Sequence, residues 1–558
     1  MNFKSLFRKK PTNVIILQGG DGEQHILNKV LSVRDLTFFG IAAIIGGGTF
    51  SAIGNACFSG GPGVILLYVI CAIACGFTAM CYAEFAARVP VSGSAYTYAY
   101  VSFGELFAWI IGWALLMEYS IGNIYIAFSW SGYFTNLLEG FGINLPEWLT
   151  INYKAAKLAF IDKTVGEGLT AWNTAPQIGS LRIIFDLPAV MVNIIITWLV
   201  YIGTKESKNI SNIMVMIKLA VIVLIILVGF FYIDIDNWTP FMPNGFGGVM
   251  GGVSAVFFAY IGFDAVSTLA EECKNPQRDL PRGMIYSLVI CTIAYILLAL
   301  VLTGMVSYTL LGVSDPLAEI FKIKGIKWML FIVSIAAVVA MTSVLIVFQM
   351  GQPRIWMTMS RDGLLPKRFS SVHPKYKTPG FATIITGLVV GLPMFFTDEN
   401  FILDFTSIGT LFAFVLVCGG VLLLPPPLKD DTTETKGKFR MPYINAKWIF
   451  PAIVVAAAVS VLCLAPEFFT SRMTFTAETF TVNLSMIVFF ILCIVIAVLS
   501  FIKNLSLIPV LGLISCCYLL TGMSPSNWLW FSGWLGIGLL VYFGYSYRKS
   551  KLNIEAEA

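Results

Sequence analysis

Charged residues are scarce in this sequence of 558 residues. Asp, Glu, Lys and Arg together make up 12%, whereas apolar residues make up 57% and the mean hydropathy is +0.82. This composition excludes a soluble multidomain protein and a disordered chain, because neither carries so much apolar surface. At about 20 residues per membrane-spanning helix, the apolar content is enough for roughly a dozen or more spans. We therefore expect a polytopic, all-α membrane protein.

The sequence also lacks the residue patterns of metal centres, disulfide frameworks and enzymes. Its two histidines, His25 and His373, lie in polar segments, and all eleven cysteines except Cys273 fall in apolar stretches without a CxxC pair. No Ser/His/Asp set, zinc motif or phosphate-binding loop is present. We expect no metal, no cofactor and no enzymatic activity. The net charge of +5 does not indicate nucleic acid binding, because membrane proteins carry surplus Lys and Arg in their cytoplasmic loops.

Uninterrupted apolar runs predict about fourteen transmembrane helices. They lie near residues 38–58, 62–86, 104–137, 184–203, 209–233, 249–270, 283–307, 328–359, 380–396, 401–424, 448–465, 481–502, 505–520 and 526–547. With the N-terminus inside, the inner segments carry 27 Lys and Arg and the outer segments carry 8. Because basic residues concentrate in cytoplasmic loops, both termini are expected in the cytoplasm.

The first span carries three consecutive glycines at its centre, Gly46, Gly47 and Gly48. Each costs about 1 kcal/mol of helix propensity relative to alanine. Close packing against another helix is one explanation. We favour another: the backbone unwinds there, and the N–H groups at the start of the second half-helix suit a carboxylate.

The sixth span shows the same feature five helices later. Its sequence Val256-Phe-Phe-Ala-Tyr-Ile-Gly-Phe-Asp264 has a glycine in mid-helix and an acid two residues further on. Interrupted segments at matching positions of two five-helix halves are typical of inverted-repeat transporters, whose binding site lies at the membrane midplane.

Among the ionisable residues of the predicted spans, Lys218, Glu118 and Asp264 are the candidates for a functional role. Lys218 is about nine residues, or roughly 13 Å, from the start of the fifth span, too deep to reach water easily. Because burial disfavours the charged form, Lys218 is a candidate proton switch, and a permanently paired structural lysine is the alternative. Glu118 and Asp264 are candidates to meet a cationic group. For Asp264, a helix-capping role is an equally good interpretation.

Several motifs resemble one known family. These are Cys81-Tyr-Ala-Glu-Phe-Ala-Ala-Arg-Val-Pro90 with Gly93-Ser-Ala-Tyr-Thr-Tyr98, Phe258-Ala-Tyr-Ile-Gly-Phe-Asp264, Glu271-Glu-Cys-Lys-Asn-Pro-Gln277, Met359-Ser-Arg-Asp-Gly-Leu364 and His373-Pro374. Together they resemble the amino acid, polyamine and organocation superfamily, and within it the cationic amino acid transporters and their bacterial relatives. The sequence departs from the family pattern at Ala42, where glycine is usual, and at Thr49, where a branched apolar residue is usual.

The resemblance implies an inverted repeat of five plus five helices with four additional C-terminal helices. Residues 1–37 would then form a cytoplasmic tail, either an interfacial helix or a solvated segment. The remaining parts are a transport core at 38–424, a cytoplasmic loop at 425–447, four further spans at 448–547 and a second cytoplasmic tail at 548–558. The outer connection at 139–182 has no N-glycosylation acceptor, which favours the cell membrane of a bacterium.

The resemblance also implies roles for individual residues. The substrate would lie against Ile44, Ile45, Gly46, Gly47 and Gly48, with Ile44, Gly47 and Gly48 binding its α-carboxylate. Phe258, Ala259 and Ile261 would offer carbonyl groups to the α-amino group. Lys218 would stand where sodium-coupled relatives of the fold hold an ion, while Thr342 and Ser343 could ligate either species. Met341 would narrow the side-chain pocket.

These observations predict a proton-coupled amino acid symporter that works by alternating access in the lipid bilayer. We expect small neutral substrates first and cationic ones second, since Glu118 favours cations and Met341 favours small side chains. An obligate amino acid or polyamine exchanger is one alternative, and a transporter-like sensor is another. The sequence leaves open whether a small single-span membrane protein binds the additional helices.

Overall fold

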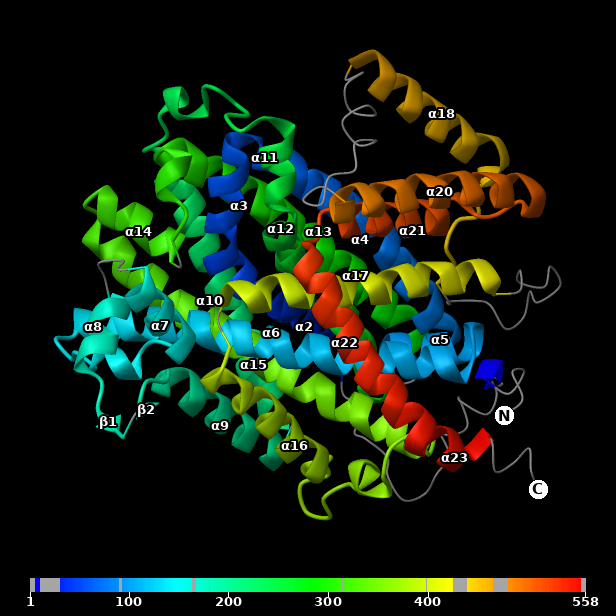
Figure 1. Cartoon of the computed structure of the whole chain (residues 1–558), viewed down its shortest axis with the longest axis horizontal. Coiled ribbons are helices and arrows are strands. Elements are labelled where there is room, and N and C mark those ends of the chain that lie inside the picture. The colour runs from blue at the N-terminus through cyan, green and yellow to red at the C-terminus, as the bar shows by residue number, and fades with distance from the viewer. Residues whose placement is uncertain are drawn as a thin grey trace.

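The computed structural model describes residues 6–10, 31–89, 93–162, 167–179, 181–203, 205–313, 315–397, 399–424, 439–464 and 480–552. This part of the chain is almost entirely helical (Figure 1). Its two short strands, β1 (Gln177–Ile178) and β2 (Leu181–Arg182), form an antiparallel pair.

The helices follow one another along the chain, with short 3₁₀ and π segments labelled η. The first half comprises α2 (Val33–Ile44), η2 (Gly48–Ala52), α3 (Ile53–Gly60), η3 (Gly61–Gly63), α4 (Val64–Arg88), α5 (Ser94–Ser102), α6 (Glu105–Gly140), η4 (Glu147–Leu149), α7 (Tyr153–Ile161), α8 (Glu167–Thr174), α9 (Leu187–Ile202) and α10 (Lys205–Phe230). The middle comprises η5 (Ile235–Trp238), α11 (Gly245–Gly251), α12 (Val253–Tyr260), η6 (Phe263–Glu272), α13 (Pro276–Met305), η7 (Tyr308–Leu310), α14 (Pro316–Ile323), α15 (Lys327–Arg361), η8 (Lys367–Ser370), α16 (Gly380–Gly391), η9 (Pro393–Phe395) and α17 (Glu399–Leu423). The last part comprises α18 (Ala446–Leu464), α20 (Phe480–Lys503), α21 (Leu507–Leu520), α22 (Pro525–Val541), η10 (Tyr542–Ser546) and α23 (Tyr547–Lys549).

The predicted spans coincide with these helices. Among the described residues, nine helical stretches are long and apolar enough to cross a membrane, and four shorter apolar helices accompany them. One of the nine stretches, Gly48–Arg88, contains both α3 and α4, which the turn η3 separates. The chain is therefore a multi-pass membrane protein, and the number of fourteen crossings stays a prediction.

Both predicted helix interruptions are present. The helix α2 ends at Ile44, Ile45 is extended (φ −81°, ψ 100°), and the chain turns helical again at η2 and α3. In the sixth span α12 ends at Tyr260, and Ile261 is extended (φ −60°, ψ 140°). Gly262 then takes a left-handed φ of 116°, which residues with a side chain rarely adopt, before η6 begins.

Glycines let the two interruptions pack directly against each other. A Cβ atom added to Gly48 would lie 2.9 Å from the Cβ atom of Ala259 and 3.0 Å from its nitrogen. A Cβ atom added to Gly262 would lie 2.7 Å from that of Ala43. Each interruption thus places a glycine on the backbone of the other, and no larger residue fits at either point without displacement.

The remaining helices surround this pair of interrupted helices. The longest ones, α6 and α15, pack along each other, and α17 packs against α6. The additional helix α21 packs against α4 and α17, whereas α22 packs against α6 and α17. In Figure 1, α18 and α20 lie at the outer edge of the molecule, where α18 packs mainly on α20.

Two parts of the chain differ from the simplest expectation. The outer connection forms a small helical unit, in which α7 and α8 bury Ala156 and Ala171 with Ile184 beside Trp172. At the N-terminal side, α2 begins at Val33 instead of residue 38. Most of the segment predicted as an interfacial helix or solvated tail lies outside the described residues.

Gly48→Ala tests the contact between the two interruptions. The added methyl group would collide with Ala259, so we expect a loss of about 1–3 kcal/mol in the free energy of unfolding and weaker substrate binding. Thermal unfolding in detergent measures the first effect. Gly76→Ala in α4 is the matched control, because nothing lies within 4 Å of its added Cβ atom. Equal melting temperatures for the two variants would contradict the packing argument.

Candidate functional site

The side chain of Lys218, on α10, ends at the interruption of the first span. Its Nζ atom donates to the carbonyl oxygens of Ala42 (3.1 Å) and Ile45 (2.7 Å) and to Oγ of Ser343 (2.9 Å). The lysine is fully buried. It therefore links three elements, α2, α10 and α15, inside the membrane-spanning region.

The interruption itself explains why a lysine is held there. In a continuous helix the carbonyl groups of Ala42 and Ile45 would accept hydrogen bonds from N–H groups four residues later. The break removes those donors, and buried carbonyl groups without a donor are costly. The ammonium group supplies the missing donors and also places a positive charge at the negative end of the α2 dipole.

Tyr295, on α13, connects the two interruptions. Its hydroxyl oxygen lies 2.9 Å from the carbonyl oxygen of Ile44 and 2.8 Å from that of Ala259. It also accepts a hydrogen bond from Oγ1 of Thr49 at 3.0 Å. Ile44 and Ala259, which the sequence predicts as substrate ligands, are therefore brought together around one side chain.

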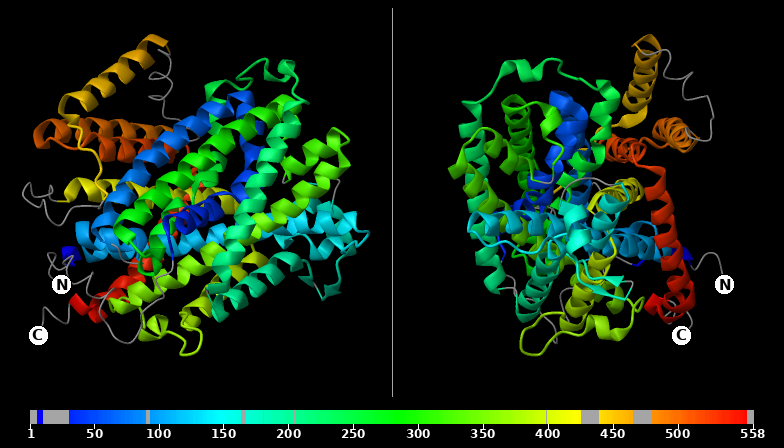
Figure 2. Two further views of the ribbon diagram at one scale, coloured as in Figure 1. Left: turned by 180° about the vertical axis from the view of Figure 1, so that it is seen from behind. Right: turned by 60° about the vertical axis from the view of Figure 1, so that its left-hand side comes forward.

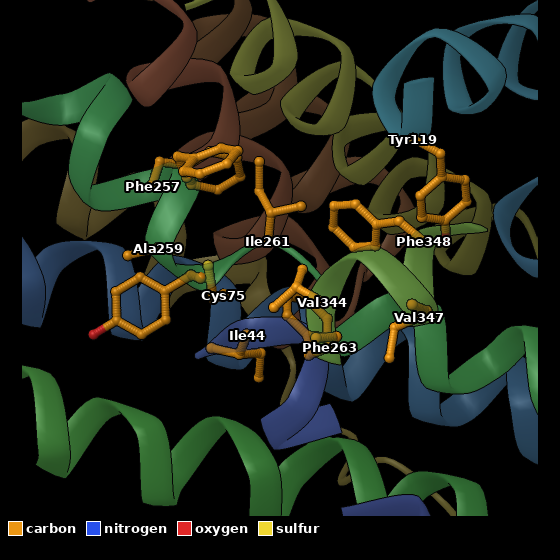
Figure 3. Packing of buried hydrophobic residues seen from close by; sticks show 14 of the residues in the cluster. Ile44, Cys75, Tyr119, Phe257, Ala259, Ile261, Phe263, Val344, Val347 and Phe348 are labelled. Atoms are coloured by element: carbon orange, nitrogen blue, oxygen red, sulfur yellow. The ribbon is translucent and has the colours of Figure 1, made fainter. Parts of the chain in front are cut away.

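Apolar and aromatic side chains surround the same point. The rings of Tyr125 and Phe258 meet edge to face with centroids 4.8 Å apart. A Cβ atom added to Gly47 would lie 3.2 Å from Tyr125, and one added to Gly46 would strike Val344 of α15. Figure 3 shows Val344 close to Ile44 and Ile261, with Phe348 lying against Tyr119.

The predicted residues of α15 divide between two surroundings. Ser343 contacts Lys218, but the hydroxyl of Thr342 accepts a hydrogen bond from Nε1 of Trp130 at 2.9 Å. The two predicted ion ligands thus point to different neighbours, because adjacent residues of a helix face different directions. Met341 is fully buried one helical turn before Val344, and Val344 is the residue that faces Gly46.

Glu118 of α6 and Asp264 of η6 are the two carboxyl groups that the sequence predicts to meet a cationic group. Both carboxyl groups are fully buried, and neither forms an ion pair within the described part of the chain. Across the described ranges, no group of three or more His, Cys, Asp or Glu side chains is placed to hold a metal ion.

The site is closed to solvent. Ile44, Ile45, Phe258 and Ile261 are at most 5% exposed, and Ala259 is completely buried. Gly46, Gly47 and Gly48 are buried as well. A molecule held between the interruptions would therefore be enclosed by protein on every side.

The sequence alone does not distinguish Tyr295, Val344, Tyr125 and Phe348 as site residues. Each lies in a long apolar run of a predicted helix, where aromatic and branched residues are ordinary. Only the folding of α6, α13 and α15 around the interruptions distinguishes them from their neighbours. None of these four residues carries a charge or another unusual property that would mark it in the sequence, as the buried charge marks Lys218.

Comparison with known proteins gives one consistent family. A profile of the amino acid permease family matches residues 31–492. The chain is 37% identical to a branched-chain amino acid permease of Bacillus subtilis strain 168, over 98% of this chain and 99% of that protein. It is 35% identical to a methylthioribose transporter of the same organism, over 98% and 99% respectively. It is 30% identical to cationic amino acid transporter 4 of Homo sapiens, over 94% and 88%.

These relatives are transporters and not enzymes, and the matches extend over nearly the whole chain. The matched region includes both interrupted helices, Lys218 and the carboxyl groups described above. The chain therefore belongs to the amino acid permease family, within the amino acid, polyamine and organocation superfamily.

Proposed function

We propose that this protein is a proton-coupled symporter that imports small neutral amino acids into the cell by alternating access. The observation that carries the proposal is the position of Lys218, whose three hydrogen bonds join the interrupted first span to α15. The excess of basic residues in the predicted inner segments supports an orientation with both chain ends in the cytoplasm, and we propose the cell membrane as the location.

The hydrogen bonds of Lys218 depend on its proton. An ammonium group has three N–H donors, one for each of its three acceptors, whereas a neutral amine has two. The hydroxyl of Ser343 donates to the carbonyl oxygen of Ala340 at 2.7 Å, so its hydrogen is already used. Loss of the proton therefore breaks at least one link at the interruption. This connects the protonation state to the backbone that would hold the substrate.

The same backbone suits the common part of an amino acid. The α-carboxylate would lie at the start of η2 and α3, where Gly46, Gly47 and Gly48 present main chain and a helix dipole. The α-amino group would lie near the carbonyl groups of Ile44 and Ala259. For Ile44 this differs from the role that the family resemblance implies, because its carbonyl oxygen accepts hydrogen bonds and suits an ammonium group, not a carboxylate. The apolar wall around Val344 favours an uncharged side chain, and a relative named for branched-chain amino acids supports this preference.

Proton coupling supplies enough energy for accumulation. One elementary charge that crosses 100 mV is worth about 2.3 kcal/mol. Each pH unit adds about 1.4 kcal/mol. Either contribution alone concentrates a zwitterion roughly tenfold or more, because about 1.4 kcal/mol corresponds to a factor of ten.

Uptake into proteoliposomes tests the proposal. We expect an inward proton gradient in sodium-free buffer to drive accumulation of radiolabelled alanine or leucine into empty vesicles. Lys218→Ala should abolish this accumulation, and so should Lys218→Arg, because arginine does not release its proton. Ser343→Ala should weaken it, whereas Thr342→Ala serves as the control because Thr342 contacts Trp130 instead.

Two results would contradict proton symport. Undiminished accumulation by Lys218→Ala would remove the lysine from the coupling mechanism. Uptake that requires amino acid inside the vesicles would make the protein an exchanger, and uptake that requires sodium would make it a sodium symporter.

Cationic amino acids are the second substrate class that we propose, because Glu118 and Asp264 are buried carboxyl groups without a cationic partner in the described chain. We expect Glu118→Gln to weaken competition by arginine about tenfold while alanine uptake stays within a few-fold of the unchanged protein. Competition assays with arginine and leucine measure this difference. An equal loss for both competitors would assign Glu118 a structural role.

We propose that Phe348 limits the size of the pocket for the substrate's side chain. Phe348 lies against Tyr119 and Gly122, one helical turn after Val344 on α15, so Phe348→Ala should improve competition by large neutral amino acids about tenfold. Met341→Ala is the comparison, since the sequence alone predicts Met341 as the limiting residue. A larger gain in competition for Met341→Ala than for Phe348→Ala would show that Met341 limits the size of the pocket. It would contradict that role for Phe348.

A further inference from the structure

The two ends of the described chain meet beside α5, the start of α6 and the end of α15. The segment Leu6–Lys10 and the segment 547–552 lie at the same end of the molecule in both views of Figure 2, and Nη1 of Arg8 donates to the carbonyl oxygen of Leu552 at 3.2 Å. We call these two segments, together with the residues that hold them, the tail clasp. Since the proposed orientation places both chain ends in the cytoplasm, we call this side of the protein the inner side.

Two buried carboxylates form the centre of the tail clasp. Asp362, directly after α15, accepts hydrogen bonds from Nζ of Lys10 at 2.5 Å and from the hydroxyl of Tyr96 at 2.7 Å. Its backbone oxygen accepts one from the N–H of Lys551 at 3.1 Å. Asp362 therefore holds both chain ends at once, from the N-terminal side through Lys10 and from the C-terminal side through Lys551.

Glu105, the first residue of α6, repeats this arrangement. Its carboxylate accepts hydrogen bonds from the hydroxyls of Ser550 at 2.5 Å and Tyr542 at 3.1 Å, and it lies 4.0 Å from Nη2 of Arg8. Its backbone N–H donates to the carbonyl oxygen of Arg8 at 3.0 Å. Glu105 is completely buried. Removal of either chain end would leave a buried carboxylate without part of its partners, so the two ends support each other.

The tail clasp is connected to the half-helix η6 through α5. Tyr96 of α5 binds Asp362 on one side, while Ser94 at the start of α5 accepts a hydrogen bond from Ser267 of η6 at 2.9 Å. Ser94 has a φ of 49°, a conformation that costs energy for a residue with a side chain. The contact between α5 and η6 is thus made at a strained position, which the surrounding structure must hold in place.

The inner end of η6 is fastened at two further points. Glu272 pairs with Arg354 of α15 at 2.5 Å, and both side chains are nearly buried. The backbone of Leu31 forms hydrogen bonds with Glu272 and Lys274 at 3.0 Å, which covers Cys273 between them. Since α5 and α15 hold η6, and the tail clasp holds α5 and the end of α15, the chain ends reinforce the closed inner side.

We propose that the tail clasp is a gate lock: it keeps the inner end of η6 closed, and its release lets that end open. The lock goes beyond the proposed transport activity, and it concerns how fast the inner side opens instead of which substrate is carried.

Labelling of Cys273 tests the lock in the full-length protein. Cys273 is fully buried at the inner end of η6, so a membrane-impermeant maleimide reaches it only when that end opens. We expect Lys10→Met to raise its labelling rate about fivefold or more, the smallest effect that couplings of this kind produce. Peptide mass spectrometry in detergent identifies the labelled cysteine. Deletion of residues 1–10 or of residues 547–558 should act in the same direction.

The matched control is Lys9→Met, because Lys9 is exposed next to Lys10 and should leave the rate unchanged. Unchanged labelling of Cys273 in both deletion variants would overturn the proposal. An equal rise at Cys71, a buried thiol of α4, would show general loosening and would also overturn it. If a deletion variant does not fold, Lys10→Met decides. The assay needs no transport, so it does not depend on proton symport.

Discussion

The direct packing of two interrupted helices determines most of this structure. Gly48 lies on Ala259 and Gly262 lies on Ala43, so the two backbones approach without side chains between them. That approach depends on the glycine at each contact, because a side chain there would collide with the other backbone. It brings main-chain groups into the centre of an apolar protein, where each needs a hydrogen-bond partner.

The polar residues of the site answer this need. Lys218 reaches the carbonyl groups that the first interruption leaves without donors, and Tyr295 reaches one carbonyl group from each interruption. A charge that is expensive inside a membrane is thereby retained as part of the architecture. In the proposed mechanism, structural and functional demands meet in the same side chain, because loss of the proton of Lys218 would also remove a hydrogen bond from the helix that it supports.

The sequence predicts the features that contrast with their surroundings. Apolar runs predict the helices, consecutive glycines predict the interruption at Gly46, and isolated charges predict Lys218 and Glu118. Tyr295 and Val344 offer no such contrast, because their importance arises only when α13 and α15 fold against the interruptions. Neighbouring residues on a helix also point in different directions, which is why Ser343 reaches Lys218 while Thr342 turns to Trp130.

The hydroxyl of Tyr295 has a further consequence. It carries a single hydrogen, yet the oxygens of Ile44 and Ala259 both lie within 2.9 Å of it. Only one of them can receive that hydrogen at a time, so the other lacks this donor, and an unmet buried acceptor costs about 1–3 kcal/mol. An ammonium group with several donors would relieve this frustration. The hydrogen bond that the ammonium group gives to the carbonyl oxygen without a donor would then contribute to the affinity for any amino acid, whatever its side chain.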